Sequence, residues 1–238
     1  MKLFKITFFF VILSFSSFAK DSTSVGFKRF VIGIYASPDY CFRTLTNNDG
    51  SSNSADIINF REEIEIPMLS YTAGADLSYF IKKQFAISLG VNFSQKGYKT
   101  KSFTLTDING SSLGATQFRY NYNYIEVPVK AIFVFGKNKI RFLASAGVTS
   151  AFLLYQQTIS KTEDYNGTKE SKKGKPNYIY NPFNLFLNGS AGVDFKLGTK
   201  IGLKIEPTYS YGLFQTIDAP ITEYLWSAGL NVGFYIGF

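Results

Sequence analysis

Residues 224–238, YLWSAGLNVGFYIGF, decide the fold of this chain. Every even-numbered position from Tyr224 to Phe238 is apolar, whereas most odd-numbered positions hold Ser, Gly or Asn. Successive side chains of a β-strand point to opposite faces, so this period of two predicts a strand with one apolar and one polar face. The same alternation runs from Ile201 to Gly212 just upstream.

Six further segments alternate in the same way, which gives eight expected strands. They are 29–40, 71–81, 85–97, 120–135, 139–156 and 183–197. The links between strands are alternately short and long. The short turns are 82–84, 136–138 and 198–200, and the long polar links are 41–70, 98–119, 157–182 and 213–223.

Strand length and strand number indicate a membrane barrel. Strands of ten or more residues exceed the globular norm of about five or six and match the roughly 9–11 tilted residues that cross a bilayer. An even number of them, with short turns at one end and long loops at the other, is typical of outer-membrane proteins. We therefore expect an all-β fold, an eight-stranded antiparallel up-and-down transmembrane β-barrel with short periplasmic turns and long extracellular loops, located in the outer membrane.

A soluble β-sandwich or a lipocalin-like barrel would also alternate. The aromatic residues favour the membrane barrel, because they gather toward two rims, as in the aromatic girdles at the two lipid interfaces. The expected girdle residues are Tyr209, Tyr211, Tyr224, Trp226, Phe234 and Phe238. The mean hydropathy of +0.01 in a chain that is 45% hydrophobic agrees with strands that face lipid on one side and a polar lumen on the other.

The first 19 residues have the layout of a secretory signal peptide. Lys2 and Lys5 precede the apolar stretch 8–13, and Ser17-Phe18-Ala19 offers the small residues of a cleavage site. An uncleaved helix or anchor is the alternative, but the apolar stretch is too short to span a membrane. We expect a leader at 1–19 and an outer-membrane β-barrel domain at 20–238.

The composition argues against most enzymatic chemistry. Histidine is absent and Cys41 is the single cysteine, so the commonest general base and the usual zinc ligands are missing. We expect no catalytic residue, no cofactor and no metal site, and interpret the acidic residues of 56–65 as solvated charges rather than a calcium site. The formal charge of +8 is scattered through turns and loops, so no nucleic acid partner is expected.

Charged residues on the polar faces are expected to meet inside the barrel. An eight-stranded barrel is just wide enough for side chains to fill, so opposite charges can pair across it. The alternative is a set of separately hydrated side chains around a narrow wet channel. The expected structural ionic network of the lumen consists of Asp76, Glu126, Lys130, Asp194, Lys204 and Glu206.

Two motifs and the terminal strand carry a family resemblance. The segment 124–130, YIEVPVK, the strand end 93–98, FSQKGY, and the aromatic strand that ends in Phe238 resemble the PorT-like outer-membrane β-barrel family of Bacteroidetes. The resemblance implies this fold, and Phe238 resembles the C-terminal signal read by the barrel-assembly machinery. The name-giving member is linked to a secretion system. From the residues themselves, Pro128 and changes of apolar parity at 124/125 and between Ile66 and Tyr71 predict strand bulges.

These patterns predict a non-enzymatic integral outer-membrane β-barrel. Its extracellular loops 41–70, 98–119 and 157–182 would mediate surface interaction or scaffolding, with a protein or polysaccharide partner. Outer-membrane lipid and, during insertion, the barrel-assembly machinery are its other expected partners. The alternative is an accessory component of a secretion or transport complex in the outer membrane.

Overall fold

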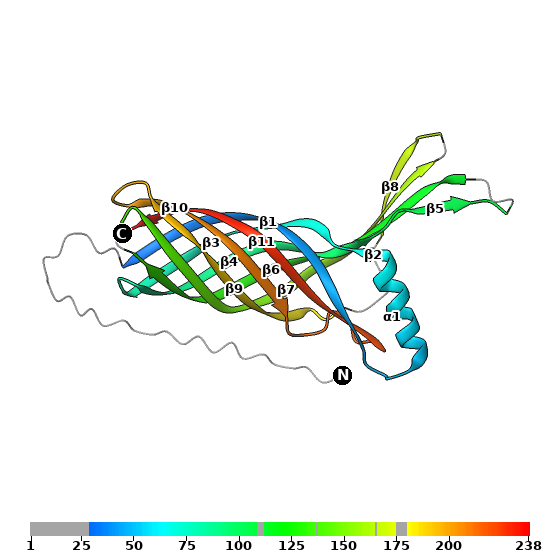
Figure 1. Ribbon diagram of the computed structural model, residues 1–238, viewed down its shortest axis with the longest axis horizontal. Coiled ribbons are helices and arrows are strands. Elements are labelled where there is room, and N and C mark those ends of the chain that lie inside the picture. Colours follow the sequence, from blue (N-terminus) through cyan, green and yellow to red (C-terminus); the bar gives the residue numbers. More distant parts are fainter. Residues whose placement is uncertain (1–28, 109–111, 137, 165, 175–179) are drawn as a thin grey trace, which may run out of the picture.

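The structure, a computed structural model, describes residues 29–108, 112–136, 138–164, 166–174 and 180–238. The predicted leader, residues 1–19, lies outside these ranges. In the described part of the chain, eight long antiparallel strands form a closed barrel (Figure 1). They are β1 (Phe30–Asn47), β3 (Met68–Lys82), β4 (Phe85–Thr100), β6 (Ser112–Phe135), β7 (Ile140–Asp164), β9 (Phe183–Lys196), β10 (Ile201–Gly212) and β11 (Ile221–Gly237).

The order of the strands around the barrel follows the sequence. Each strand pairs with the next one along the chain, and β1 closes the ring on β11 with a register that runs from Val31–Gly237 to Asn47–Ile221. The turns between β3 and β4, β6 and β7, and β9 and β10 lie at the same end as the start of β1 and the end of β11 (Figure 1). We call this the turn end and the opposite one the loop end. The expected all-β, up-and-down barrel of eight strands is confirmed.

The side chains alternate between the outer surface and the interior as expected. On β11, Asn231, Gly233 and Tyr235 are buried. Their neighbours Leu230, Val232, Phe234, Ile236 and Phe238 are exposed on the outer surface. Among the described residues, no helix is both long enough and apolar enough to cross a membrane.

The long connection 41–70 is not a loop throughout, contrary to expectation. Strand β1 continues to Asn47, and helix α1 (Ser52–Ile64) follows, with the Ser51 side chain accepting a hydrogen bond from the Ser54 amide as N-cap. The short strand β2 (Glu65–Ile66) then pairs with β4. The sequence of this segment does not predict these elements. It lacks the apolar alternation of a strand, and the apolar stripe of the helix is weak.

The connections 98–119 and 157–182 also differ from the expected loops. Strands β6 and β7 continue beyond the barrel, and β5 (Phe103–Thr106) and β8 (Lys169–Gly174) pair with them at either edge. We call β5, β8 and the outer parts of β6 (112–120) and β7 (158–164) the extension sheet, which projects from the loop end (Figure 1). The outer parts of β6 and β7 and the whole of β8 carry polar residues on both faces, and β5 has only four residues, so a search for apolar alternation misses them.

The interior is filled differently along its length. At the turn end lies an apolar layer of Val31, Phe80, Ala86, Ile132, Val134, Leu143 and Tyr235. Toward the loop end lies an aromatic-rich layer of Tyr98, Tyr122, Tyr124, Ala151, Phe186 and Leu225. Polar and charged side chains occupy the space between these two layers.

The predicted bulges are found only in part. The register with β4 shifts by one residue between Ile66 and Tyr71, as expected. At 124/125, however, β6 keeps its parity: Tyr124 is buried inside because the aromatic-rich layer makes the interior apolar there. The shift in the β6–β7 ladder at this level places its extra residue, Leu154, in β7. No register shift occurs at Pro128, which pairs with Thr149 within the described ladder.

Candidate functional site

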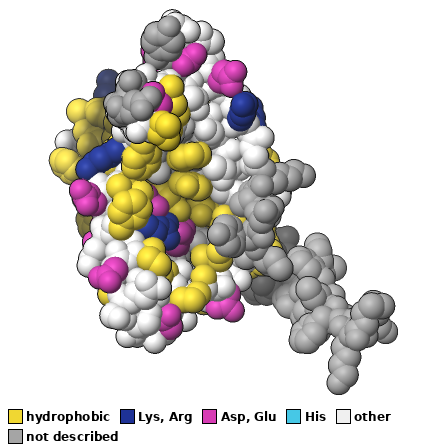
Figure 2. Space-filling view, turned by 90° about the vertical axis from the view of Figure 1, so that its right-hand side faces the viewer, with side chains coloured by type: hydrophobic (Ala, Val, Ile, Leu, Met, Phe, Trp, Pro, Cys, Tyr) yellow, Lys and Arg dark blue, Asp and Glu magenta, His cyan; other side chains and the backbone are white. Residues whose placement is uncertain are grey.

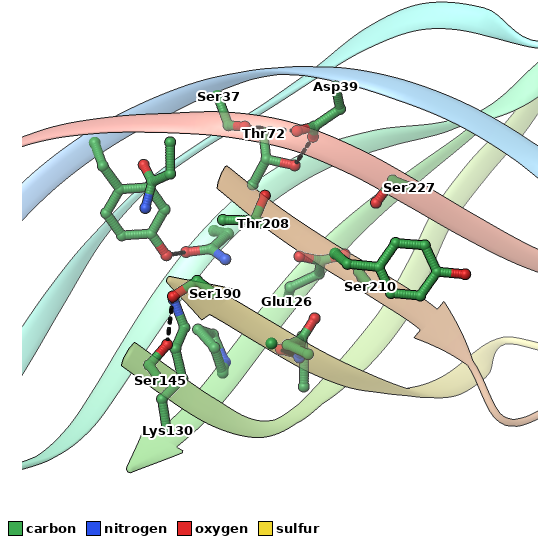
Figure 3. Close-up of a pocket in the computed structure, with 18 of the residues that line it drawn as sticks. Ser37, Asp39, Thr72, Glu126, Lys130, Ser145, Ser190, Thr208, Ser210 and Ser227 are labelled. Carbon is green, nitrogen blue, oxygen red and sulfur yellow. Dashed lines mark hydrogen bonds between the residues drawn. The ribbon is translucent and has the colours of Figure 1, made fainter. Parts of the chain in front are cut away.

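The middle of the barrel contains a polar cavity of about 70 Å³ (Figure 3). Its wall includes Tyr35, Asp39, Asn92, Glu126 and Lys130, together with several serine and threonine hydroxyls. The Tyr35 hydroxyl donates to the Asn92 side-chain oxygen, and the Ser145 and Ser190 hydroxyls lie 2.7 Å apart. A polar cavity of this volume has room for a few water molecules.

Two of the predicted lumen carboxylates form ion pairs. Glu126 lies 3.4 Å from the Lys96 ammonium and accepts a 2.6 Å hydrogen bond from Ser94, and all three are buried. Asp194 pairs with Arg141 and accepts a 2.7 Å hydrogen bond from the Tyr235 hydroxyl. The predicted network did not include the partners Lys96 and Arg141. Their positions on the polar faces of β4 and β7 indicate that both side chains point into the lumen, and this signal could have added them to the network.

The other four predicted network residues, Asp76, Lys130, Lys204 and Glu206, surround a second cavity of about 20 Å³. Asp76 accepts a 2.9 Å hydrogen bond from Ser88, and Glu206 accepts a 3.0 Å hydrogen bond from Ser190. The two ammonium groups lie over aromatic rings, that of Lys130 at 5.3 Å from Tyr35 and that of Lys204 at 5.2 Å from Tyr235. Within the described residues, no ion pair shorter than 4.0 Å joins these four, so the structure gathers them without direct contact.

A second charged cluster joins α1 to the barrel wall at the loop end. Glu65 accepts hydrogen bonds of 2.8 Å from Arg43 and from Arg61, and Arg61 reaches Glu223 on β11 at 2.7 Å. The Tyr98 hydroxyl donates to the same Glu223 carboxylate at 3.1 Å. Arg43, Glu65 and Glu223 are buried, so the interpretation of 56–65 as a run of solvated charges is wrong for Glu65.

Burial and neighbouring charges shift the pKa of two members of this cluster, Arg61 and Tyr98. Burial by itself lowers the pKa of Arg61, but the carboxylates of Glu65 and Glu223 more than offset it, and the pKa lies above its usual value. Burial, and then the negative charge of Glu223, raise the pKa of Tyr98 well above its usual value. Arg61 therefore stays charged and Tyr98 stays neutral near pH 7.

Seen from the loop end, hydrophobic side chains cross the middle of the surface beside basic and acidic ones (Figure 2).

The predicted girdle residues form two bands on the outer surface. Toward the loop end, the rings of Tyr209 and Trp226 stack at 6.2 Å, and Tyr211 and Tyr224 are partly exposed nearby on the same two strands. Toward the turn end, Phe234 and Phe238 are exposed. Trp226 and Phe238 are twelve residues apart (238 minus 226). On a tilted strand this separation corresponds to a height of about 30 Å, the thickness of a hydrocarbon core.

The arrangement offers little to a metal ion or a nucleophile. In the part of the chain that the structure describes, no three His, Cys, Asp or Glu side chains cluster as metal ligands would. Cys41 is buried, with its sulfur 3.9 Å from the Gln95 carbonyl oxygen. What the interior provides is a set of ion pairs and hydrogen bonds between strands.

Comparison with known proteins gives one family match. A family model described as outer membrane protein beta-barrel domain matches residues 18–218, more than four fifths of the chain. A search of curated proteins finds no significant match.

Several solved structures are similar to this chain. Neisserial surface protein A is 13% identical, with 88% of this chain and 97% of that one covered and a TM-score of 0.46. OprG from Pseudomonas aeruginosa is 11% identical, with 90% and 99% covered and a TM-score of 0.41. Ail, the attachment invasion locus protein of Yersinia pestis, is 12% identical, with 87% and 98% covered and a TM-score of 0.31.

Proposed function

Because the chain belongs to the outer membrane protein beta-barrel domain family and is an outer-membrane protein, we propose that it is a non-enzymatic barrel whose extracellular part mediates surface interaction or scaffolding. The loop end is then extracellular and the turn end periplasmic. The single observation that carries the proposal is the extension sheet, which projects beyond the barrel at the loop end.

The extension sheet has the properties of a rigid binding element. Its four strands are hydrogen-bonded in the order β5, β6, β7, β8, and β6 and β7 continue into the barrel wall as paired strands with a single one-residue bulge at Leu154. Every residue of β8 is exposed, and most of the outer part of β6 is partly exposed. Binding residues are commonly carried by segments that a rigid scaffold positions. A paired sheet presents its side chains at a lower entropic cost than a flexible loop does.

The filled interior supports a scaffold rather than a pore. The ion pair Lys96–Glu126, between the two layers, connects β4 with β6, and the ion pair Arg141–Asp194, beside the apolar layer at the turn end, connects β7 with β9. We propose that the six-residue network of Asp76, Glu126, Lys130, Asp194, Lys204 and Glu206 is structural and helps to hold the barrel closed. The absence of histidine from the sequence supports a lack of hydrolytic activity.

Four finer proposals rest on the sequence and on the two aromatic bands. Residues 1–19 are a cleaved signal peptide. The motifs at 93–98 and 124–130 support membership of the PorT-like barrels. During insertion, the aromatic strand that ends in Phe238 is recognised by the barrel-assembly machinery. In the membrane, the two aromatic bands contact outer-membrane lipid.

The test is to remove the extension sheet and keep the barrel. In the variant, residues 103–117 and 159–173 are each replaced by a short Gly-Asn turn; in the control, the β10–β11 connection, residues 213–220, is replaced instead. Folding of both is verified by heat-modifiable gel migration. Fluorescently labelled, refolded protein is then applied to an array of polysaccharides and to purified surface proteins.

We expect a polysaccharide or surface protein bound by the natural chain to be lost by the variant and kept by the control. Equal binding by all three proteins would contradict the proposal. So would co-purification of the natural chain, in stoichiometric amount, with a secretion complex from detergent extracts.

A further inference from the structure

A row of basic residues crosses the outer face where the extension sheet leaves the barrel. Lys99 on β4 pairs with Arg119 on β6, Arg119 pairs with Ile159 on β7, and Ile159 pairs with Lys173 on β8. Directly paired residues of an antiparallel sheet point to the same face. Lys161, two residues beyond Ile159, also points to it. We call Lys99, Arg119, Lys161 and Lys173 the basic row.

The basic row lacks the acidic partners that other lysines of the extension sheet have. Lys169 lies 3.5 Å from Glu163, and Lys172 lies 3.2 Å from Glu170. Within the described residues, no carboxylate lies within 4.0 Å of the charged group of any member of the basic row. Four like charges without acidic partners on one face favour an anionic ligand.

Arg119 is held in a fixed position by its neighbours. Its Nη2 donates to the Leu69 carbonyl oxygen at 3.0 Å and to the Gln95 side-chain oxygen at 3.1 Å, and its Nε donates to the Asn121 side-chain oxygen at 2.8 Å. Within the described structure these bonds use Nε and Nη2 and leave the Nη1 edge for a ligand. A guanidinium that is already ordered loses little entropy when it donates a hydrogen bond to a phosphate.

The guanidinium of Arg119 lies just beyond the aromatic band of the loop end. Its partner Gln95 pairs directly with Tyr71, whose ring lies 6.0 Å from that of Phe93 on the lipid-facing surface. Leu69, whose carbonyl also accepts from Arg119, is 73% exposed on the same face. Aromatic girdles mark the level of the lipid headgroups. The basic row therefore begins where the headgroups of the outer leaflet lie.

We propose that the basic row binds the phosphate groups of a phosphorylated glycolipid of the outer leaflet. Arg119 is the central contact and donates a charge-assisted hydrogen bond to a phosphate oxygen through Nη1, while Lys99, Lys161 and Lys173 supply point charges to the same or a second phosphate. Leu69 and Tyr71 contact the acyl chains below. The bound lipid fixes the base of the extension sheet against the membrane surface.

The experiment uses the full barrel refolded in detergent and titrated with diphosphoryl lipid A, with lipid adducts counted by native mass spectrometry. The test variant is K99Q/R119Q. The matched control is K169Q/K172Q, which removes the same charge from lysines that already have carboxylate partners. Dephosphorylated lipid A and inorganic phosphate are the two comparison ligands, and heat-modifiable migration verifies that every variant is folded.

We expect the apparent affinity for diphosphoryl lipid A to fall by about tenfold or more in K99Q/R119Q. In K169Q/K172Q it should change by less than about twofold. Dephosphorylated lipid A should bind the natural chain as weakly as diphosphoryl lipid A binds the test variant. Equal losses in the two variants, or equal affinity for the dephosphorylated lipid, would overturn the proposal. Full displacement of the lipid by millimolar inorganic phosphate would replace it with a site for free anions.

Discussion

At the scale of single residues, Leu230 and Asn231 are neighbours in the chain with opposite surroundings. Leu230 is 43% exposed on the outer surface between the two aromatic bands, and Asn231 is buried in the lumen. A charged residue on the lipid face must be transferred into hydrocarbon, so L230R should lower the free energy of unfolding by about 2–4 kcal/mol. Urea titration of the barrel refolded in vesicles measures this change.

The matched control is N231S, which replaces one small polar lumen residue by another. We expect a change below about 1 kcal/mol, because the side-chain oxygen of Asn231 has no hydrogen-bond partner in the described structure and the change leaves no partner behind. If L230R and N231S unfold at the same urea concentration, the assignment of the two faces is wrong.

Tyr98 gives a prediction about pH. Because burial and Glu223 raise its pKa, neutral Tyr98 contributes stability that is complete below about pH 10, its unfolded pKa, and is lost as the pH rises through the folded value. Alkaline titration followed by tyrosinate absorbance tests this. The difference between the natural chain and Y98F should have its midpoint above pH 10, whereas a midpoint at the ordinary tyrosine value would show that the hydroxyl is accessible to solvent.

At the scale of elements, the attachment of α1 depends on Glu65. This carboxylate joins Arg43 of β1 and Arg61 of α1, and removing one member of a buried ion pair costs about 3–5 kcal/mol because the remaining charge stays buried. In E65Q we expect the amides of α1 to lose their protection from hydrogen exchange while those of β11 keep theirs. The control E62Q changes an exposed carboxylate three residues earlier and should leave α1 protected. Equal protection in both variants would contradict this role of Glu65.

The elements also show what sequence patterns can predict. All eight barrel strands were predictable, because lipid on one side and a polar lumen on the other impose the alternation of Leu230 and Asn231 along each strand. The same rule failed at Tyr122 and Tyr124, because the interior is itself aromatic there and an apolar residue no longer indicates the lipid face. The cluster of Arg43, Glu65 and Glu223 was missed because its members meet through tertiary folding from segments without a regular period.

At the scale of the whole molecule, two separate layers close the lumen. The apolar layer includes Phe80 and Leu143, and the aromatic-rich layer includes Tyr122 and Phe186. We expect planar bilayers that contain the natural protein to show no steady conductance of porin size. Two double variants each open one layer, F80A/L143A the apolar one and Y122A/F186A the aromatic-rich one. Neither should conduct, because the other layer still blocks the lumen, and only the combined four-residue variant should conduct. Steady conductance by the natural chain would contradict the filled interior.

The pairing of β1 with β11 has a consequence for biogenesis. Val31 lies opposite Gly237 in one ladder although the two are 206 residues apart in the chain (237 minus 31), so the ring closes only after the last strand has been translated. Until then the first strand has an unpaired edge that another chain can add to. Closure of the barrel, and with it complete insertion, is therefore expected only after synthesis of the whole chain.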